Sequence, residues 1–181
     1  MRAIGRSFSA HPTWLAGALL TVVVLSAIVW YLASPLFVRT YMNEPLPTMP
    51  PRSGSPVVPV TETPLQPSTP ARVLRSGDLG YVDAIHNGTG PVRIIDVGRQ
   101  RFVRFEDVML TNAPDVHVYL SRETGGRWDE GTSLYLGPLK ATNGSFNYEL
   151  PETVDPAAYR SVVVWCRAFH VLITWPDLVA I

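Results

Sequence analysis

Hydrophobic and polar positions divide the chain into regions of different character. An uninterrupted apolar run, WLAGALLTVVVLSAIVWYLA, extends from Trp14 to Ala33 and contains no charged residue. A proline-rich stretch follows it, and beyond residue 70 short apolar segments alternate with polar turn clusters. This pattern predicts four parts: a cytoplasmic tail over residues 1–12, a transmembrane helix over 13–34, a Pro-rich linker over 35–70 and an extracytoplasmic β-rich domain over 71–181.

The apolar run has the length of a membrane span. A bilayer core is ~30 Å thick and needs ~20 apolar helical residues, and Trp14, Trp30 and Tyr31 stand where aromatic side chains favour the headgroup level. A cleaved signal peptide is the alternative, but its apolar region spans only ~7–15 residues and ends at a small-x-small site. A buried core helix is disfavoured because the run has no polar face. We expect an uncleaved anchor.

The charged residues beside the apolar run favour one orientation. Arg2 and Arg6 precede it and Arg39 follows it, a slight excess of positive charge on the N-terminal side. We therefore expect a single-pass protein of the cell membrane, with the lipid bilayer as its partner through residues 13–34 and the C-terminal domain outside the cytoplasm.

The segment after the anchor is rich in proline. Nine of the thirty residues from Tyr41 to Pro70 are Pro, and Pro fixes φ and removes backbone donors. Polyproline II rises ~3.1 Å per residue and acts as a semi-rigid spacer, so we expect a stalk that holds the domain well away from the membrane. A disordered linker has nearly the same consequence, and a docking motif for a proline-reading partner is a further alternative.

Beyond Pro70 the pattern is that of short strands. Val116, Val118 and Leu120 fall on one face of an alternating segment, with His117 and Tyr119 on the other. No sustained helical period occurs, so we expect an all-β fold, an antiparallel β-sandwich or a barrel. The other candidate strands cover Arg101–Glu106, Leu134–Leu136, Asn147–Leu150, Tyr159–Trp165 and Val171–Trp175, and the predicted turns lie at Asn87-Gly88, Gly125-Gly126 and Asn143-Gly144.

Composition excludes several functional classes. The formal net charge is zero and no Lys/Arg-rich run occurs, which argues against nucleic-acid binding. Cys166 is the single cysteine, so the chain forms no internal disulfide. No phosphate-binding loop, zinc-type ligand spacing or Ser-His-Asp order indicates a hydrolase or a transferase.

Several segments, in one order, are similar to a known family. The region from Ser76 onward resembles the DM-thirteen domain, which often occurs with DOMON domains and is described as an electron-transfer module. The chain departs from the family at Ala113, where Gly is usual, and at Thr174 and Pro176, where Gly and Ala are usual. The matching segments are His86-x-x-x-Gly90, Arg101–Val108, Pro114–Leu120, Leu136–Lys140, Tyr148-x-x-Pro151 and Ser161–Cys166 with Phe169.

The resemblance implies an all-β sandwich with Cys166 as its redox residue. From the residues alone, Cys166 equally suits a core position, since free Cys packs as a small hydrophobe and a thiol in apolar surroundings is inert. Dithiol chemistry needs a second sulfur. Redox chemistry at Cys166 therefore requires a bound cofactor, whose identity the sequence does not give, a partner thiol or a sulfenic-acid step.

Other polar residues offer weaker candidates. His86, His117 and His170 are metal-ligand types, but without diagnostic spacing we expect surface or hydrogen-bonded histidines and no metal site. Asp115 suits turn chemistry better than cation binding. Glu106-Asp107 reads as a solvated loop edge, and Asn87 and Asn143 begin glycosylation sequons.

Two functions of different class stay open. The first is a membrane-anchored extracytoplasmic redox or electron-transfer accessory that acts through Cys166 with an unidentified cofactor or a redox partner. The second is a non-enzymatic interaction or structural module, in which Cys166 is a packing residue.

Overall fold

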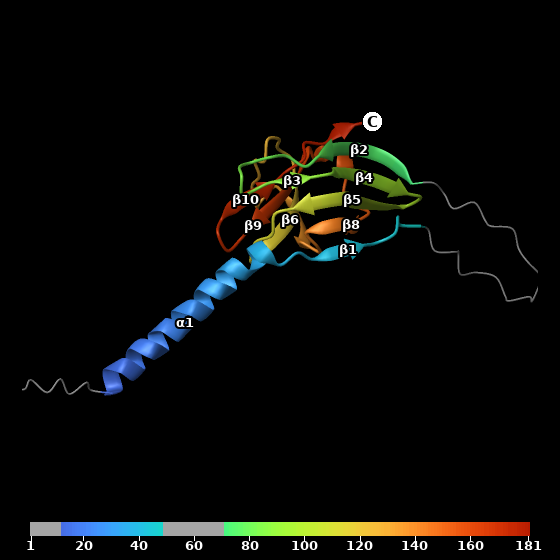
Figure 1. Cartoon of the computed structure of the whole chain (residues 1–181). Coiled ribbons are helices and arrows are strands. Elements are labelled where there is room, and N and C mark those ends of the chain that lie inside the picture. The colour runs from blue at the N-terminus through green and yellow to red at the C-terminus, as the bar shows by residue number, and fades with distance from the viewer. Residues whose placement is uncertain (1–11, 49–70) are drawn as a thin grey trace, which may run out of the picture.

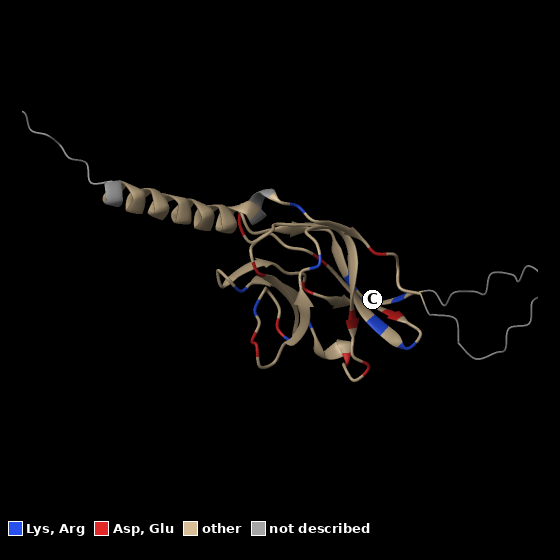
Figure 2. Ribbon diagram, turned by 90° about the horizontal axis from the view of Figure 1, so that it is seen from below, with Lys and Arg blue, Asp and Glu red and all other residues tan. Residues whose placement is uncertain are grey.

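The computed structural model describes residues 12–48 and 71–181, which form one long helix and a domain of two β-sheets (Figure 1). Helix α1, Pro12–Phe37, extends away from the domain, and its side chains are exposed from Trp14 to Leu32. The helix carries no charged residue, whereas charged residues of both signs are dispersed over the domain (Figure 2). Its apolar length is sufficient to cross a membrane, so it fits a single-pass anchor, as predicted.

Two β-sheets form the domain, and all strand pairs are antiparallel except β1 with β8. The larger sheet has the order β1-β8-β5-β4-β2-β11, with β3 beside β5, and the smaller has the order β10-β9-β6-β7. The larger sheet comprises β1 (Tyr41–Asn43), β2 (Arg72–Asp78), β3 (Gly88–Thr89), β4 (Pro91–Val97), β5 (Gln100–Leu110), β8 (Asn143–Leu150) and β11 (Val179–Ala180). The smaller comprises β6 (Val116–Ser121), β7 (Leu134–Pro138), β9 (Ser161–Cys166) and β10 (Val171–Thr174), and a 3₁₀ turn, η1 (Pro156–Ala158), precedes β9.

The core lies between the two sheets, which confirms the predicted all-β sandwich. Phe105 and Phe146 stack with ring centroids 4.9 Å apart and are fully buried. On the facing sheet, the predicted inward positions of β6 are buried as expected, and β9 is buried on both of its faces. The buried inward residues of β6, β9 and β10 are Val116, Val118, Leu120, Val162, Val164, Cys166 and Ile173.

One predicted turn and one predicted loop edge are wrong, for a shared reason. Asn143-Gly144 lies inside β8 and Glu106-Asp107 lies inside β5, where the register shifts between Phe105 and Val108. Asp107 and Gly144 have φ of 46° and 106°. Left-handed residues that favour turns also form β-bulges, so the turn signal marks a bulge in a continuous pair of strands. Glu106 pairs with Arg93 on the neighbouring strand β4 and is not a free surface carboxylate.

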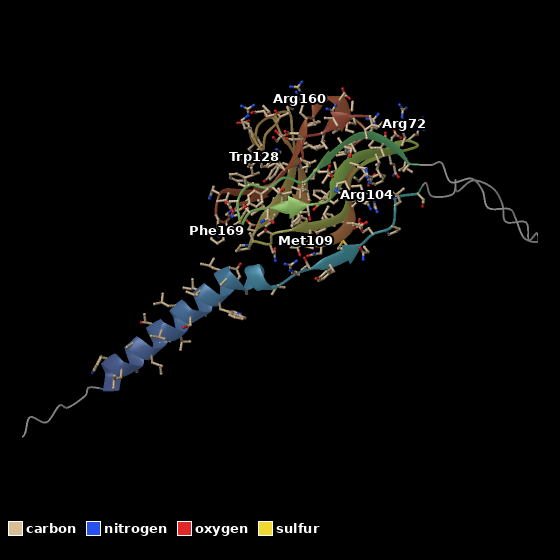
Figure 3. All side chains as sticks on the ribbon, turned by 45° about the horizontal axis from the view of Figure 1, so that its top comes forward. Arg72, Arg104, Met109, Trp128, Arg160 and Phe169 are labelled. Carbon is tan, nitrogen blue, oxygen red and sulfur yellow. The ribbon has the colours of Figure 1, made fainter. Side chains whose placement is uncertain are left out.

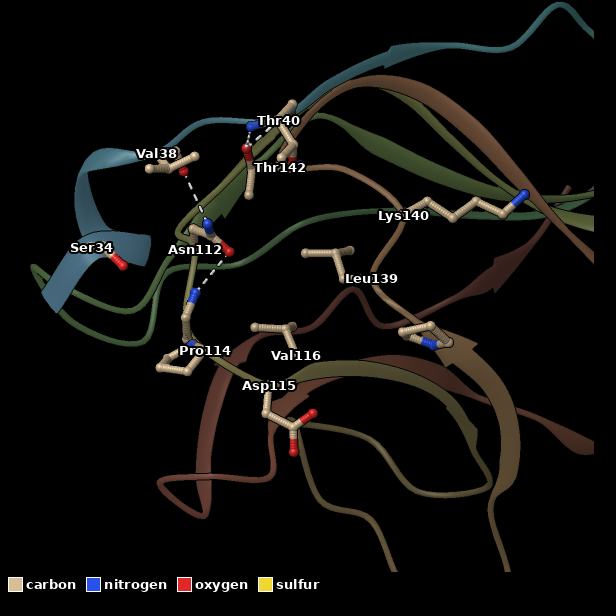
Figure 4. Close-up of a pocket in the computed structure, with 12 residues that line it drawn as sticks. Ser34, Val38, Thr40, Asn112, Pro114, Asp115, Val116, Leu139, Lys140 and Thr142 are labelled. Atoms are coloured by element: carbon tan, nitrogen blue, oxygen red, sulfur yellow. Dashed lines mark hydrogen bonds between the residues drawn. The ribbon is translucent and has the colours of Figure 1, made fainter. Parts of the chain in front are cut away.

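The start of the expected stalk is instead part of the domain. Tyr41–Asn43 forms the edge strand β1, parallel to β8, and Asn112 Nδ2 donates to the Val38 carbonyl at 2.9 Å (Figure 4). Residues 38–48 are therefore part of the domain, and the predicted spacer is wrong for them. A strand can form here because the first proline after the helix end is Pro45, which lies beyond β1. The rest of the predicted linker, residues 49–70, lies outside the described residues.

We define residues 38–48 as the junction segment. Glu44 binds this segment to the domain. Its carboxylate accepts from Lys140 Nζ at 2.9 Å and from the Asn147 backbone N–H at 2.8 Å. Partial burial alone raises the pKa of Glu44, but these hydrogen bonds and the Lys140 charge outweigh it, so the pKa lies below its usual value. The domain thus begins a few residues after the helix ends.

Candidate functional site

The outer face of the smaller sheet carries a cluster of aromatic and polar side chains. Alternation along β6 turns His117 and Tyr119 away from the core. The cross-strand partners of these residues are Trp165 on β9 and Tyr135 on β7, respectively. Because cross-strand partners share a face, these four side chains are grouped there by the strand register. We call them, together with Trp128 and Arg167, the outer aromatic cluster.

His117 is held by hydrogen bonds at both ring nitrogens. Nε2 lies 2.6 Å from Asp115 Oδ1, and Nδ1 lies 2.8 Å from the Tyr135 hydroxyl. An ionised carboxylate only accepts hydrogen bonds, so Nε2 donates to Asp115. In the uncharged form of the ring, Nδ1 is then an acceptor, and the Tyr135 hydroxyl donates to it. The arrangement is a directed Tyr–His–Asp chain.

The aromatic rings of the cluster form an unbroken series. Ring centroids lie 5.3 Å apart between Trp165 and Trp128, 4.3 Å between Trp128 and Tyr119, and 5.2 Å between Tyr119 and Tyr135. These separations are those of rings in van der Waals contact. Trp128, labelled in Figure 3, comes from the loop between β6 and β7 and is half-buried. The series leads from half-buried Trp165 to Tyr135, whose side chain is 46% exposed.

Arg167 covers the cluster at one side. Its guanidinium lies 4.8 Å from the Tyr135 ring centroid and its Nε donates to the Tyr119 hydroxyl at 2.7 Å. Burial raises the pKa of Tyr119, although the hydrogen bond from Arg167 acts in the opposite direction. The same hydrogen bond raises the pKa of Arg167. Both groups therefore keep their protons at neutral pH.

Cys166 lies on the opposite side of the same sheet. Its side chain has no exposure and belongs to the core between the sheets, while the preceding residue, Trp165, faces the outer cluster. A partner in solution cannot reach this sulfur while the domain is folded. Redox chemistry at Cys166 stays a prediction, and its burial favours the packing role.

The structure does not bring the histidines and Cys166 into one group. His86 bonds to Asp83 at 2.8 Å, and His170 occupies the tight turn between β9 and β10 with φ of 53°. Across residues 12–48 and 71–181, no three His, Cys, Asp or Glu side chains are grouped as metal ligands. Asp115 does lie in a turn, but its carboxylate bonds to His117.

The two sequons differ in accessibility. Asn143 is buried, and its side-chain oxygen accepts from the Thr142 hydroxyl at 3.0 Å, so the folded domain leaves no room for a glycan there. Asn87 is half-buried, and its amide donates to the carbonyls of Asp83 and Ala84.

Sequence reasoning singled out His117 and Asp115 but missed their partners. The alternation of β6 places Tyr119 beside His117 and was sufficient to find it. Trp128 lies in an irregular loop without periodicity, and the pairing of Tyr135 depends on a register shift between Val118 and Tyr119. No local pattern indicates either contact.

Comparison with known protein families identifies a match over the domain. A family model described as "Electron transfer DM13" matches residues 81–176, just over half of the chain. The matched region contains every member of the outer aromatic cluster, and Cys166. No curated protein and no solved structure matches the chain.

Proposed function

Since the chain belongs to the DM13 electron-transfer family, as the resemblance indicated, we propose that it is a membrane-anchored electron-transfer accessory that exchanges single electrons through the outer aromatic cluster. Helix α1 holds the domain at the outer surface of the cell membrane. The partner is a one-electron donor or acceptor outside the cytoplasm.

The observation that carries the proposal is the continuous series of rings from Trp165 to Tyr135. Single electrons move readily between aromatic rings in contact, and the indole and phenol rings are the most easily oxidised of the apolar side chains. A purely structural face would need neither the series nor a hydrogen-bonded base at its exposed end. The sulfur of Cys166 is fully buried in the core. In this proposal Cys166 is therefore a packing residue, and the aromatic rings carry the electrons.

The position of the domain relative to α1 supports anchoring close to the bilayer. The junction segment connects helix and domain without a spacer, and Val29, Leu32 and Ala33 line one apolar recess. Ile85 and Phe169 of the domain line the same recess and are 61% and 47% exposed. Apolar side chains at this level suit the membrane interface. The excess of arginines before the helix favours an extracytoplasmic domain.

The alternative is a non-enzymatic interaction module, and the burial of Cys166 is what favours it. Both functions are consistent with a sandwich fold, since fold alone does not define function. Only electron transfer requires the rings to be oxidised in turn.

The test is photo-oxidation of the full-length protein in lipid vesicles with a soluble ruthenium polypyridyl oxidant, read by transient absorption of tryptophan and tyrosine radicals. Trp128→Leu removes the second of the four rings in the series, and we expect severalfold slower oxidation. Trp30→Leu, in α1, is the matched control and should oxidise as the wild type does. Equal rates for both variants and the wild type would remove electron transfer through this face and leave the interaction module.

A further inference from the structure

We propose that Tyr135 is a proton-coupled redox site, at which the phenol loses an electron and passes its proton to Nδ1 of His117. The inference rests on the proposed electron-transfer function and names the residue on which the radical forms and persists. It follows from the geometry of three side chains: His117 and Tyr135 are placed by the strand register, and Asp115 by the turn that precedes β6.

The hydrogen-bond chain supplies the proton acceptor before any oxidation occurs. The Tyr135 hydroxyl lies 2.8 Å from Nδ1 of His117, a distance that a proton crosses within an existing hydrogen bond. On the far side of the ring, Asp115 Oδ1 lies 2.6 Å from Nε2. The carboxylate fixes the tautomer and stabilises the imidazolium that forms.

Oxidation of Tyr135 transfers one electron and one proton. The O–H bond of Tyr135 breaks, its proton forms a bond to Nδ1 of His117, and one electron leaves for a one-electron oxidant such as a ferric or cupric centre of a partner. The products are a neutral phenoxyl radical, a His117 imidazolium and the reduced metal. The return of one electron from a reductant, with the proton from His117, restores the starting state.

Arg167 favours this neutral product over a radical cation. Its guanidinium lies 4.8 Å from the centre of the Tyr135 ring, and a fixed positive charge there opposes a second positive charge on the ring. Loss of the phenol proton avoids that repulsion. The proton passes to the His117 ring, whose other nitrogen is bonded to the Asp115 carboxylate.

Tyr119 has no proton acceptor comparable to the His117 ring beside Tyr135 among the residues that the structure describes. Its side chain is 2% exposed, and its hydroxyl accepts a hydrogen bond from Arg167. Within residues 12–48 and 71–181, no acceptor is bonded to its proton. Tyr119 therefore passes electrons on without holding a radical, whereas Tyr135 holds one and, at 46% exposure, offers it to a partner.

The experiment is flash photo-oxidation of the full-length protein in vesicles, with the radical identified by electron paramagnetic resonance and its rate of formation followed in H2O and D2O. The wild type should give a tyrosyl radical that forms more slowly in D2O. Tyr135→Phe keeps the ring but should lose this signal. His117→Gln should slow radical formation roughly a hundredfold, at the low end of what a positioned proton acceptor contributes.

Tyr81→Phe is the control, because Tyr81 is 68% exposed and lies outside the cluster; it should behave as the wild type. Thermal unfolding of each variant verifies that it is folded. A tyrosyl signal that survives Tyr135→Phe, or a rate unchanged by His117→Gln, overturns the inference. If a tryptophan radical forms on the cluster without dependence on His117, this inference fails while electron transfer stands. If no ring of the cluster is oxidised, both fail.

Discussion

Cys166 and Trp165 are neighbours in sequence with opposite environments. Strand β9 alternates, so Cys166 faces the buried core and Trp165 faces the outer aromatic cluster. The motif that suggested thiol chemistry thus also delivers an aromatic ring to the other face. At Cys166 the motif contributes to packing, because the side chain fills space in the core as a small hydrophobic residue does.

Burial of Cys166 predicts slow alkylation. We expect the native thiol to react with a maleimide only at the rate at which the domain opens, because the sulfur has no exposure. Ala168→Cys places a second thiol at an exposed position two residues away and should react at the rate of a free thiol. Rapid modification of Cys166 in the folded wild type would contradict the packing role and return the thiol to the electron path.

The edge strand β1, which lies within the junction segment, depends on one glycine of β8. Gly144 has φ of 106°, and a Cβ added there would lie 2.1 Å from the Met42 carbonyl oxygen of β1. The sequence Asn143-Gly144 predicted a turn because such glycines are common in turns. The glycine instead permits a close backbone approach inside a sheet, which only the tertiary pairing reveals.

Gly144→Ala should therefore displace β1 and destabilise the domain. We expect a loss of ~1–3 kcal/mol in the free energy of unfolding from backbone strain, together with faster amide hydrogen exchange over residues 40–44. Gly125→Ala is the control, since Gly125 also has positive φ, 68°, but nothing lies within 4 Å of its added Cβ. Similar exchange over β1 in both variants would show that Met42 does not pack against Gly144.

The docking of β1 should also depend on pH through Glu44. The pKa of Glu44 in the folded protein lies below 4.5, the value expected for the free side chain. The ionised carboxylate therefore stabilises the docked segment fully above about pH 4.5, and this contribution is lost as the pH falls through the lowered pKa. The protection of the residue 40–44 amides, measured relative to their intrinsic exchange rates at each pH, should fall over that acidic range in the wild type. Glu44→Gln should show low protection throughout, and a wild-type protection that stays constant over this pH range would contradict the role of Glu44.

The sequence was sufficient to predict the elements that have a regular hydrophobic pattern along their whole length. It was insufficient for the strands that form only because a neighbouring strand pairs with them. The apolar run gave the helix, and alternation gave the inward face of β6. Strands β2 and β4 were missed, although β4 reads PVRIIDV, because a proline opens it and charges interrupt its alternation. Strand β1 lies before a proline-rich stretch and exists only because β8 accepts it as an edge.

As a whole, the molecule consists of an apolar helix joined closely to a domain. Two exposed apolar side chains of the domain, Ile85 and Phe169, line one recess together with the end of the helix. Phe169 lies on the side of the domain near α1, and Arg160 lies on the far side (Figure 3). If α1 spans the bilayer, the β9–β10 turn meets the lipid interface and the outer aromatic cluster sits just above it. A partner in the same membrane would then reach Tyr135 without a long stalk.

This arrangement predicts different surroundings for spin labels at the two positions. A label on Phe169→Cys in vesicles should be relaxed preferentially by oxygen, which partitions into lipid. A label on Arg160→Cys should be relaxed by an aqueous nickel chelate. The buried Cys166 should not take up label in either variant. Water-like relaxation at both positions would mean that the domain stands clear of the bilayer.

The measurement that tests the account most directly is the yield of protein radical after flash photo-oxidation of full-length Cys166→Ala in vesicles, compared with the wild type. Electron transfer through the outer aromatic cluster predicts an unchanged yield and the same tyrosyl signal, because the sulfur only packs. A radical yield that disappears in Cys166→Ala, in a domain that still unfolds cooperatively, would contradict the account and place the redox step at the thiol.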